Sequence, residues 1–282
     1  KLLVVEPQNA DALRALDALL VQGERWADLE PVLVTQTKSD DIFDDERVLV
    51  WTRLAELYRD RLDRRDDAVQ AWKEVLELQD MHEPALRALR EMYTEDERWP
   101  ELFDILQRLS DIARDPEERV QHLGIMAQIA EQYLDQPNKA IELWEDVLSA
   151  RPDDVESVGE LQRLLIAQGD AATTSDARQK AYGALAEAYE RELRMNVAHT
   201  KERRLDVYKG IGRLWQSELD DVFNAQSAWE RARNEEPFDR EALDALRGIH
   251  QAGGNDSARA EILESARWPL RVSRWPKVAR SP

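Results

Sequence analysis

Three nine-residue stretches of the chain decide the fold: residues 68–76 (AVQAWKEVL), residues 140–148 (AIELWEDVL) and residues 225–233 (AQSAWERAR). Each begins with alanine and has tryptophan at its fifth position: Trp72, Trp144 and Trp229. Small and apolar residues within each stretch lie three and four positions apart, the period of one face of an α-helix. The sequence therefore predicts a recurring amphipathic helix, and such an internal repeat governs how the domains are counted.

A second recurring unit lies between these stretches. The pair Arg25-Trp26 recurs as Arg98-Trp99, with apolar residues at matching positions before and after both pairs. A superperiod of about 72 residues therefore holds two units of about 36, each with two helical stretches. No stretch alternates with period two over more than a few residues, so the predicted fold class is all-α. A ligand-stacking role for the two tryptophans is an alternative, but recurrence at a fixed period favours a structural position at the start of a helix.

The pattern of the second helix in each unit resembles that of the tetratricopeptide repeat (TPR) superfamily. The sequence Ala140-x3-Trp144-x2-Val147-x4-Pro152 matches the TPR pattern for this helix, and residues 225–237 follow it as well. Tryptophan replaces the usual phenylalanine, and the glycine of the tight turn is often Glu or Asp. The resemblance extends to about Gly254 and implies a right-handed α-α superhelical solenoid of TPR-like helix-turn-helix hairpins. Half-a-TPR repeats of RNA-processing proteins are the nearest competing pattern.

This register divides the chain into a repeat array, residues 1–266, and a C-terminal tail, residues 267–282. The array begins inside a repeat, as expected for a piece of a longer chain. Residues 170–180 are an insertion in one hairpin, and their Thr, Ser and Asp side chains favour a surface loop over a longer helix. A leading half-repeat precedes seven hairpins, at roughly residues 9–36, 46–78, 83–113, 118–150, 155–194, 203–235 and 239–266.

The composition excludes several kinds of chemistry. The chain has no cysteine, and its 39 basic and 58 acidic side chains give a net charge of −19. Thiolate metal sites are thereby excluded, and general binding of nucleic acid is disfavoured because phosphate contacts need a basic surface. The four histidines, His82, His122, His199 and His250, have no ligand spacing, and no glycine-rich phosphate loop occurs. We expect no metal, no cofactor and no catalytic residue.

In the TPR resemblance, a protein partner binds the exposed side of the first helix of each hairpin, helix A. That surface is polar and mixed in sign, and it lacks the Lys and Asn ladder with which chaperone-binding TPR domains hold a C-terminal carboxylate. Small residues such as Ala127, Ala140, Gly212 and Ala225 are expected where helices cross, with Asp153 and Asp239 as N-caps. The side chains expected on the helix A surface are Thr52, Glu56, Arg59, Arg87, Glu91, Gln128, Glu131, Gln132, Glu156, Arg163, Lys209, Arg213 and Gln216.

Two functions fit this sequence. The first is a non-enzymatic protein-protein interaction scaffold or adaptor, and the net negative charge favours a partner with a basic stretch. The second is a regulatory or recognition segment of a larger enzyme or multiprotein complex. A third, an RNA-processing protein of the half-a-TPR type, requires a basic groove that the acidic array does not supply. The absence of cysteine leaves localisation open, with the cytoplasm slightly favoured, and no transmembrane span is expected.

The tail differs in composition from the array. Residues 267–282 carry five basic and no acidic side chains and contain two Trp-Pro pairs, which interrupt a regular helix. We expect Trp268 or Trp275 to cover an apolar gap on the last hairpins, so that the tail caps the end of the array. Self-association through the array ends or the tail is a further expectation.

Overall fold

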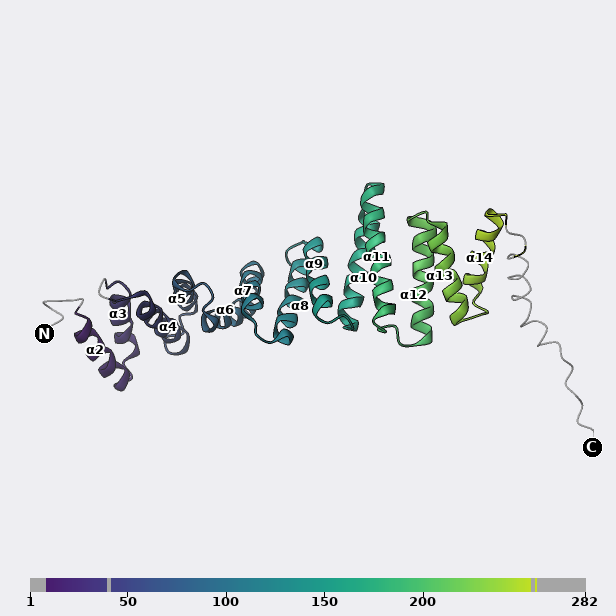
Figure 1. Cartoon of the computed structure of the whole chain (residues 1–282). Helices are drawn as coiled ribbons and strands as arrows, with labels where there is room; N and C mark the ends of the chain where they lie inside the picture. The colour runs from purple at the N-terminus through teal and green to yellow at the C-terminus, as the bar shows by residue number, and fades with distance from the viewer. Residues whose placement is uncertain (1–8, 40–41, 255–256, 258–282) are drawn as a thin grey trace, which may run out of the picture. The chain divides into compact units, whose positions relative to one another are not determined.

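All described elements of the protein are helices. The computed structural model describes residues 9–39, 42–254 and 257, and none of these residues forms a strand (Figure 1). The all-α prediction is therefore confirmed. The helices are α2 (Ala10–Gln22), α3 (Trp26–Thr37), α4 (Asp44–Asp60), α5 (Arg65–Leu78), α6 (Glu83–Glu95), α7 (Trp99–Ile112), α8 (Pro116–Gln132), α9 (Pro137–Ala150), α10 (Val155–Ala171), α11 (Ser175–Arg194), α12 (Lys201–Arg213), the π-helix η1 (Leu214–Glu218), α13 (Val222–Glu235) and α14 (Arg240–Ala252).

Within each of the two compact units, helices that follow one another in sequence pack together. Within the pairs, α4 packs on α5, α10 on α11 and α12 on α13. Successive pairs meet through the second helix of one and the first helix of the next, as α5 meets α6 and α13 meets α14. This is the hairpin packing of a TPR-like array. By the repeat register, helix A is α2, α4, α6, α8, α10, α12 and α14, and helix B is α3, α5, α7, α9, α11 and α13.

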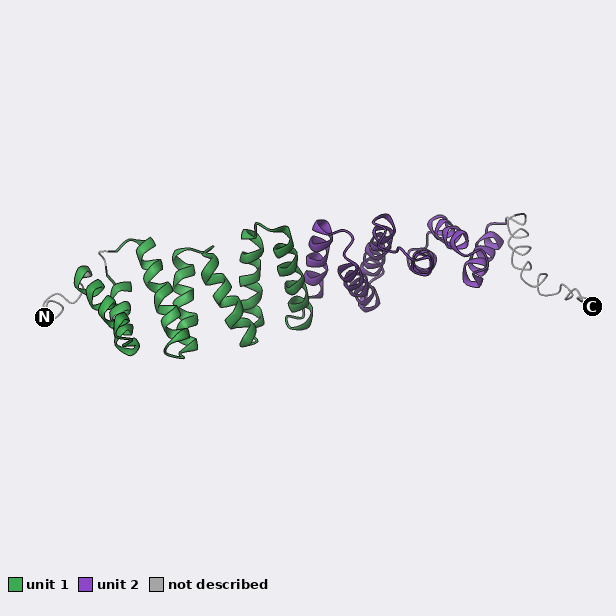
Figure 2. Ribbon diagram, turned by 90° about the horizontal axis from the view of Figure 1, so that it is seen from below, with its two compact units in different colours: residues 1–136 green, residues 137–282 purple. Residues whose placement is uncertain are grey.

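The chain divides into two compact units, residues 1–136 and residues 137–282 (Figure 2). Unit 1 contains α2 to α8 and unit 2 contains α9 to α14. The boundary falls inside the hairpin predicted at residues 118–150. The expected leading half-repeat, the second helix of the last hairpin and the tail with Trp268 and Trp275 lie outside the described residues.

The turns explain how the array forms with few glycines. Several non-glycine residues have a positive φ, among them Glu24 and Glu97 at equivalent turns between helix A and helix B. After Glu97, the backbone N–H of Arg98 donates to the carbonyl of Tyr93 at 2.9 Å, as in a Schellman motif. Glutamate thus occupies the place of the tight-turn glycine. A left-handed conformation costs such residues about 1–2 kcal/mol each.

Most helices are capped by a polar side chain. Asp239 accepts a hydrogen bond from the backbone N–H of Ala242 at 2.9 Å, as predicted for the start of α14. The prediction of Asp153 for α10 is wrong by one residue, because Asp154 is the N-cap and accepts from the N–H of Ser157. Adjacent aspartates satisfy the same capping preference, so the sequence alone does not distinguish them.

The interior is built around the tryptophans of helix B. Trp72, Trp144 and Trp229 are all buried. Gly212 of α12 lies against Trp229, and a Cβ at this position would come within 2.6 Å of the indole ring. The small residues predicted at helix crossings also let the helices approach closely, since Ala127, Ala140 and Ala225 are fully buried.

The segment predicted as a long loop is mostly helix. α10 continues to Ala171 and α11 begins at Ser175, so the connection is only residues 172–174. Thr174 caps α11, and its Oγ1 accepts from the N–H of Ala177 at 3.2 Å. The Ala, Arg, Gln and Lys residues that follow are strong helix formers, so the insertion lengthens the helices.

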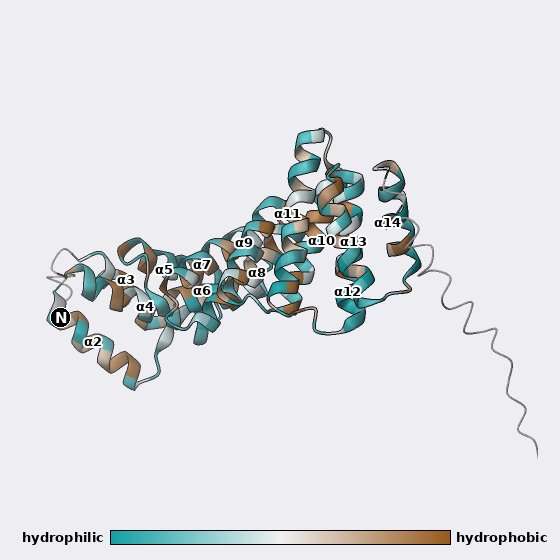
Figure 3. Ribbon diagram, turned by 45° about the vertical axis from the view of Figure 1, so that its right-hand side comes forward, coloured by the Kyte–Doolittle hydropathy of each residue, from teal (hydrophilic) through white to brown (hydrophobic). Residues whose placement is uncertain are grey.

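The helices are amphipathic, with hydrophilic and hydrophobic residues on different sides (Figure 3). Burial follows this pattern, since Leu54 and Ala55 of α4 are buried while Glu56 is exposed. Among the described residues, no helix is both long and apolar enough to cross a membrane.

Candidate functional site

The helix A surface of unit 1 begins on α4. Glu56 and Arg59 are exposed, and Thr52 is half-buried with no hydrogen-bond partner for its Oγ1. The Arg59 guanidinium donates to Asp60 at 2.7 Å. This hydrogen bond, with the charges of Asp60, Glu56 and Glu91, raises the pKa of Arg59 despite the opposing effect of burial. Glu91 of α6 therefore lies within electrostatic reach of Arg59.

On α6 and α8 the predicted residues have different environments. Arg87 is half-buried and pairs with both Glu83, at 2.9 Å, and Glu118 of α8, at 2.7 Å. Glu91 of α6 is exposed. On α8, Glu131 is half-buried, whereas the two neighbouring glutamines, Gln128 and Gln132, are exposed.

In unit 2 the predicted residues lie on α10, α12 and η1. Glu156 is exposed, and Arg163 pairs with Glu160 one turn before it, at 2.6 Å. Lys209 and Arg213 both pair with Glu241 of α14, at 2.9 and 2.6 Å. These contacts, with the Arg213 hydrogen bond as the largest contribution, lower the pKa of Glu241 to about 2.

Gln216 lies in η1, and its side chain serves the interior of the array. Its Oε1 accepts a hydrogen bond from Nε1 of the buried Trp229 at 3.0 Å. The amide therefore satisfies the only polar atom of that indole ring. The predicted surface residues that have partners within the chain include Arg59, Arg87, Glu131, Arg163, Lys209, Arg213 and Gln216.

Ion pairs between successive A helices are a feature that the sequence interpretation missed. Arg14 of α2 pairs with Glu46 of α4 at 2.6 Å, and the equivalent Arg87 of α6 pairs with Glu118 of α8 at 2.7 Å. The sequence does contain a signal for these ion pairs, because both the arginines and the glutamates recur at the same register position in successive superperiods. A side-by-side comparison of charged positions in the repeats could have found this pairing.

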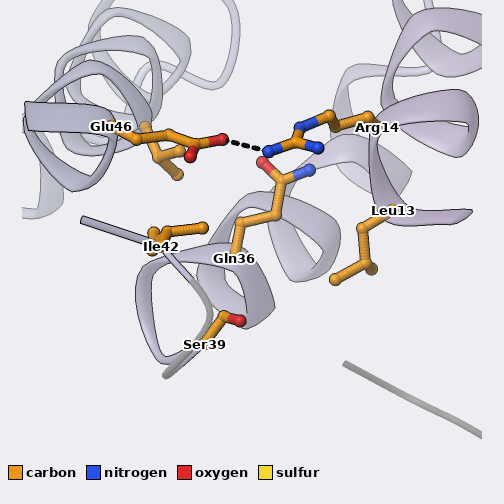
Figure 4. Close-up of a pocket in the computed structure, with 7 residues that line it drawn as sticks. Leu13, Arg14, Gln36, Ser39, Ile42 and Glu46 are labelled. Carbon is orange, nitrogen blue, oxygen red and sulfur yellow. Dashed lines mark hydrogen bonds and ion pairs between the residues drawn. The ribbon is translucent and has the colours of Figure 1, made fainter. Parts of the chain in front are cut away.

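A hollow adjoins each of these ion pairs. Figure 4 shows the first, where the Gln36 side chain points towards the Arg14–Glu46 pair. Gln36 is buried, and its Nε2 has no hydrogen-bond partner. In the equivalent hollow beside Arg87, Leu109 takes the place of Gln36. The lining of the first hollow is Leu13, Arg14, Gln36, Ser39, Ile42, Glu46 and Val50.

Trp26 and Trp99 contact residues of the helix pair that follows each of them. The Arg61 guanidinium lies over the Trp26 ring, 4.8 Å from its centroid. At the equivalent place Tyr133 stacks on Trp99, with ring centroids 4.1 Å apart. Arg61 and Tyr133 each follow the last residue of a helix A, so the structural interpretation of both tryptophans accounts for their contacts.

The histidines have separate environments. His82 caps α6, and its Nδ1 accepts from the N–H of Ala85 at 3.3 Å. His122 is buried, and its Nδ1 has no partner. Nδ1 of His199 lies 2.8 Å from the carbonyl of Val197. Within the described residues, no group of three or more His, Asp or Glu side chains is arranged to hold a metal ion.

No family model and no curated protein matches the sequence. In sequence pattern and helix pairing, the chain is similar to TPR proteins. Solved structures that resemble it include MamA, with 14% identity over 79% of this chain and 98% of that chain and a TM-score of 0.35. Another is TTC0263, a thermophilic TPR protein of Thermus thermophilus, with 16% identity, coverage of 80% and 96%, and a TM-score of 0.33. A TPR protein of Parabacteroides merdae ATCC 43184 has 15% identity, coverage of 92% for both chains and a TM-score of 0.35.

Proposed function

We propose that this chain is a non-enzymatic interaction scaffold that binds a protein segment through its helix A surface. One observation carries the proposal: exposed polar side chains recur on consecutive A helices, such as Glu56, Glu91 and Gln128 in unit 1. Helices backed by buried tryptophans hold these side chains on rigid elements. A recurring surface of this kind suits an extended partner that contacts several repeats.

The ion pairs narrow the set of residues available to a partner. Lys209 and Arg213 are held by Glu241, and Arg87 is held by Glu83 and Glu118. A partner that used these cations would first have to displace their carboxylates. The contacts are therefore assigned mainly to the exposed acids and amides: Glu56, Glu91, Gln128, Gln132 and Glu156.

Charge favours a partner segment that contains a basic stretch. The chain carries a net charge of −19, so a basic segment is attracted and an acidic one is repelled on approach. Attraction between exposed charges is screened by salt over about 8 Å at physiological ionic strength. The association rate should therefore fall as salt is raised.

Two variants of equal charge change test the surface. Glu56→Lys with Glu91→Lys alters helix A, and Glu74→Lys with Glu77→Lys alters exposed positions on helix B of the same unit. Peptides selected against the full chain should bind the helix A variant about tenfold more weakly and the helix B variant unchanged. Equal loss in both variants, or tight and salt-sensitive binding of RNA in place of peptides, would contradict the proposal.

A further inference from the structure

We call the passage from one helix A to the next helix A a step of the array. Three steps are equivalent by register: from α2 to α4, from α6 to α8 and from α10 to α12. The side chains of the first two steps follow this equivalence, since Arg14–Glu46 and Arg87–Glu118 are the same pair in successive superperiods. Three positions after Arg14 and Arg87, the steps differ. The residues at this position are Asp17, Arg90 and Gln162.

In the first step, this position is closed by an ion pair. Asp17 is buried, and its two oxygens accept hydrogen bonds from Arg53 of α4 at 2.5 and 2.7 Å. A bidentate pair of this geometry uses the guanidinium fork fully. Neither the Asp17 carboxylate nor the Arg53 guanidinium is therefore available to bind a partner.

In the third step, two buried side chains and an arginine close the position. Gln162 and Glu192 are 6% and 2% exposed, and the Gln162 amide donates to Glu192 at 2.7 Å. Arg203 of α12 donates to both Glu192 oxygens, at 2.6 and 2.8 Å, and to Gln162 at 3.1 Å. All three side chains are therefore satisfied internally.

In the second step, the position is open. Arg90 is half-buried, and within the described residues its guanidinium has neither a hydrogen bond nor an ion pair. Ile125 of α8 stands where Arg53 stands in the first step, and it is 43% exposed. Arg90 and Ile125 thus occupy the register positions of the paired Asp17 and Arg53, and no carboxylate among the described residues forms an ion pair with Arg90.

The neighbouring His122 places Arg90 against α8. Burial lowers the pKa of the His122 imidazole, and the charges of Arg90 and Arg87 lower it further, against the opposing effect of Glu118. The positive charge of Arg90 therefore acts on His122, which lies one helical turn before Ile125 on α8. Glu118 is already bound to Arg87, so it does not neutralise Arg90.

We propose that the α6–α8 step anchors the partner segment through a side-chain carboxylate. An Asp or Glu of the segment binds the Arg90 guanidinium, and an adjacent aliphatic residue of the segment packs on Ile125. This inference rests on the proposed function and specifies the partner's chemistry at one step of the helix A surface.

The charge around the α6–α8 step limits which kind of partner segment can supply this carboxylate. Glu91 is exposed next to Arg90, and the net charge of −19 repels an acidic segment. The segment must offer one carboxylate to Arg90 and must not be acidic as a whole. A single acidic residue within an otherwise basic or neutral segment satisfies both conditions, because its carboxylate reaches Arg90 while basic residues face Glu56 and Glu91. The anchor therefore sets the register of the segment, and its basic residues promote the encounter.

A selection with a charge reversal tests this inference. Random short peptides, displayed with their C-terminus fused to a coat protein so that only side-chain carboxylates are offered, are selected against the full chain. The same library is selected against Arg90→Glu and against the control Arg119→Glu, which makes the same charge change at an exposed position on α8. Wild type and control should enrich Asp or Glu beside Ile, Leu or Val, and Arg90→Glu should enrich Lys or Arg there.

Peptides selected by the wild type should bind Arg90→Glu at least about tenfold more weakly and bind Arg119→Glu as before. A neutral variant, Arg90→Gln, should show the same loss with an unchanged unfolding midpoint, which separates binding from folding. Selected peptides that bind all variants equally overturn the anchor and leave the helix A surface in place. A library that yields no binder to the full chain overturns the proposed function itself.

Discussion

The α10–α12 step and the α6–α8 step occupy the same place in the repeat. The side chains of the α10–α12 step are bound to one another, whereas Arg90 of the α6–α8 step is available to a partner. In the α10–α12 step, the buried Gln162 and Glu192 are both hydrogen-bonded, to each other and to the more exposed Arg203. In the α6–α8 step, Arg90 has no partner among the described residues, and Ile125 is exposed. The buried tryptophans of helix B therefore build the array, whereas the side chains at the position of Arg90 and Gln162, with the residues that face them, decide whether a step stabilises the fold or is available for binding.

The largest expected effect concerns the layer that all steps share. Trp229→Ala should lower the free energy of unfolding by about 3–5 kcal/mol, because it empties a buried site against Gly212. Urea unfolding of the full chain measures this loss. Trp26→Ala is the control, since Trp26 is only half-buried and should cost about 1 kcal/mol. Equal losses would mean that the buried tryptophans Trp72, Trp144 and Trp229 contribute no more to stability than the half-buried Trp26.

The next effect concerns the closed step. Glu192→Gln removes the buried charge that Arg203 and Gln162 bind, and it should destabilise the chain by about 2 kcal/mol. This loss is below the cost of breaking a fully buried pair because Arg203 is 46% exposed and can turn to solvent. The same unfolding measurement applies. A change indistinguishable from zero would show that the network does not close the step.

The turn before α7 offers a change of opposite sign. Glu97 has φ 55°, a conformation that glycine adopts without steric cost, so Glu97→Gly should stabilise the chain by about 1 kcal/mol. Glu91→Gly, on the helical backbone of the same hairpin, should destabilise it by about 1 kcal/mol. Opposite shifts of the midpoint in a thermal melt would support the turn geometry, and two losses would contradict it.

The smallest effect belongs to the open step. Arg90→Gln should change the free energy of unfolding by less than about 0.5 kcal/mol, as for a surface residue without partners. Arg203→Gln, at the closed step, should cost about 1–2 kcal/mol because it leaves Glu192 buried without its cation. If both variants lost the same stability, the two steps would not differ in the way their contacts indicate.

The sequence predicted the helix pairs because a tryptophan at a fixed period leaves few alternatives to a recurring amphipathic helix. It did not predict the length of α11, since Thr174 and its neighbours have the same composition in a loop and in a helix cap. The register also identified exposed residues such as Glu56 and Gln128. It did not reveal that Lys209 and Arg213 are held by Glu241, because that contact joins α12 to α14 across an intervening helix and depends on side-chain reach.

The most direct test of the interaction surface is hydroxyl-radical footprinting of the full chain with and without a selected peptide. Ile125 reports on the open step of helix A, and Phe223, which is 80% exposed at the start of α13, reports on helix B. We expect the peptide to protect Ile125 from oxidation and to leave the oxidation of Phe223 unchanged. Protection of Phe223 with Ile125 still fully reactive would contradict the assignment of partner binding to the helix A surface.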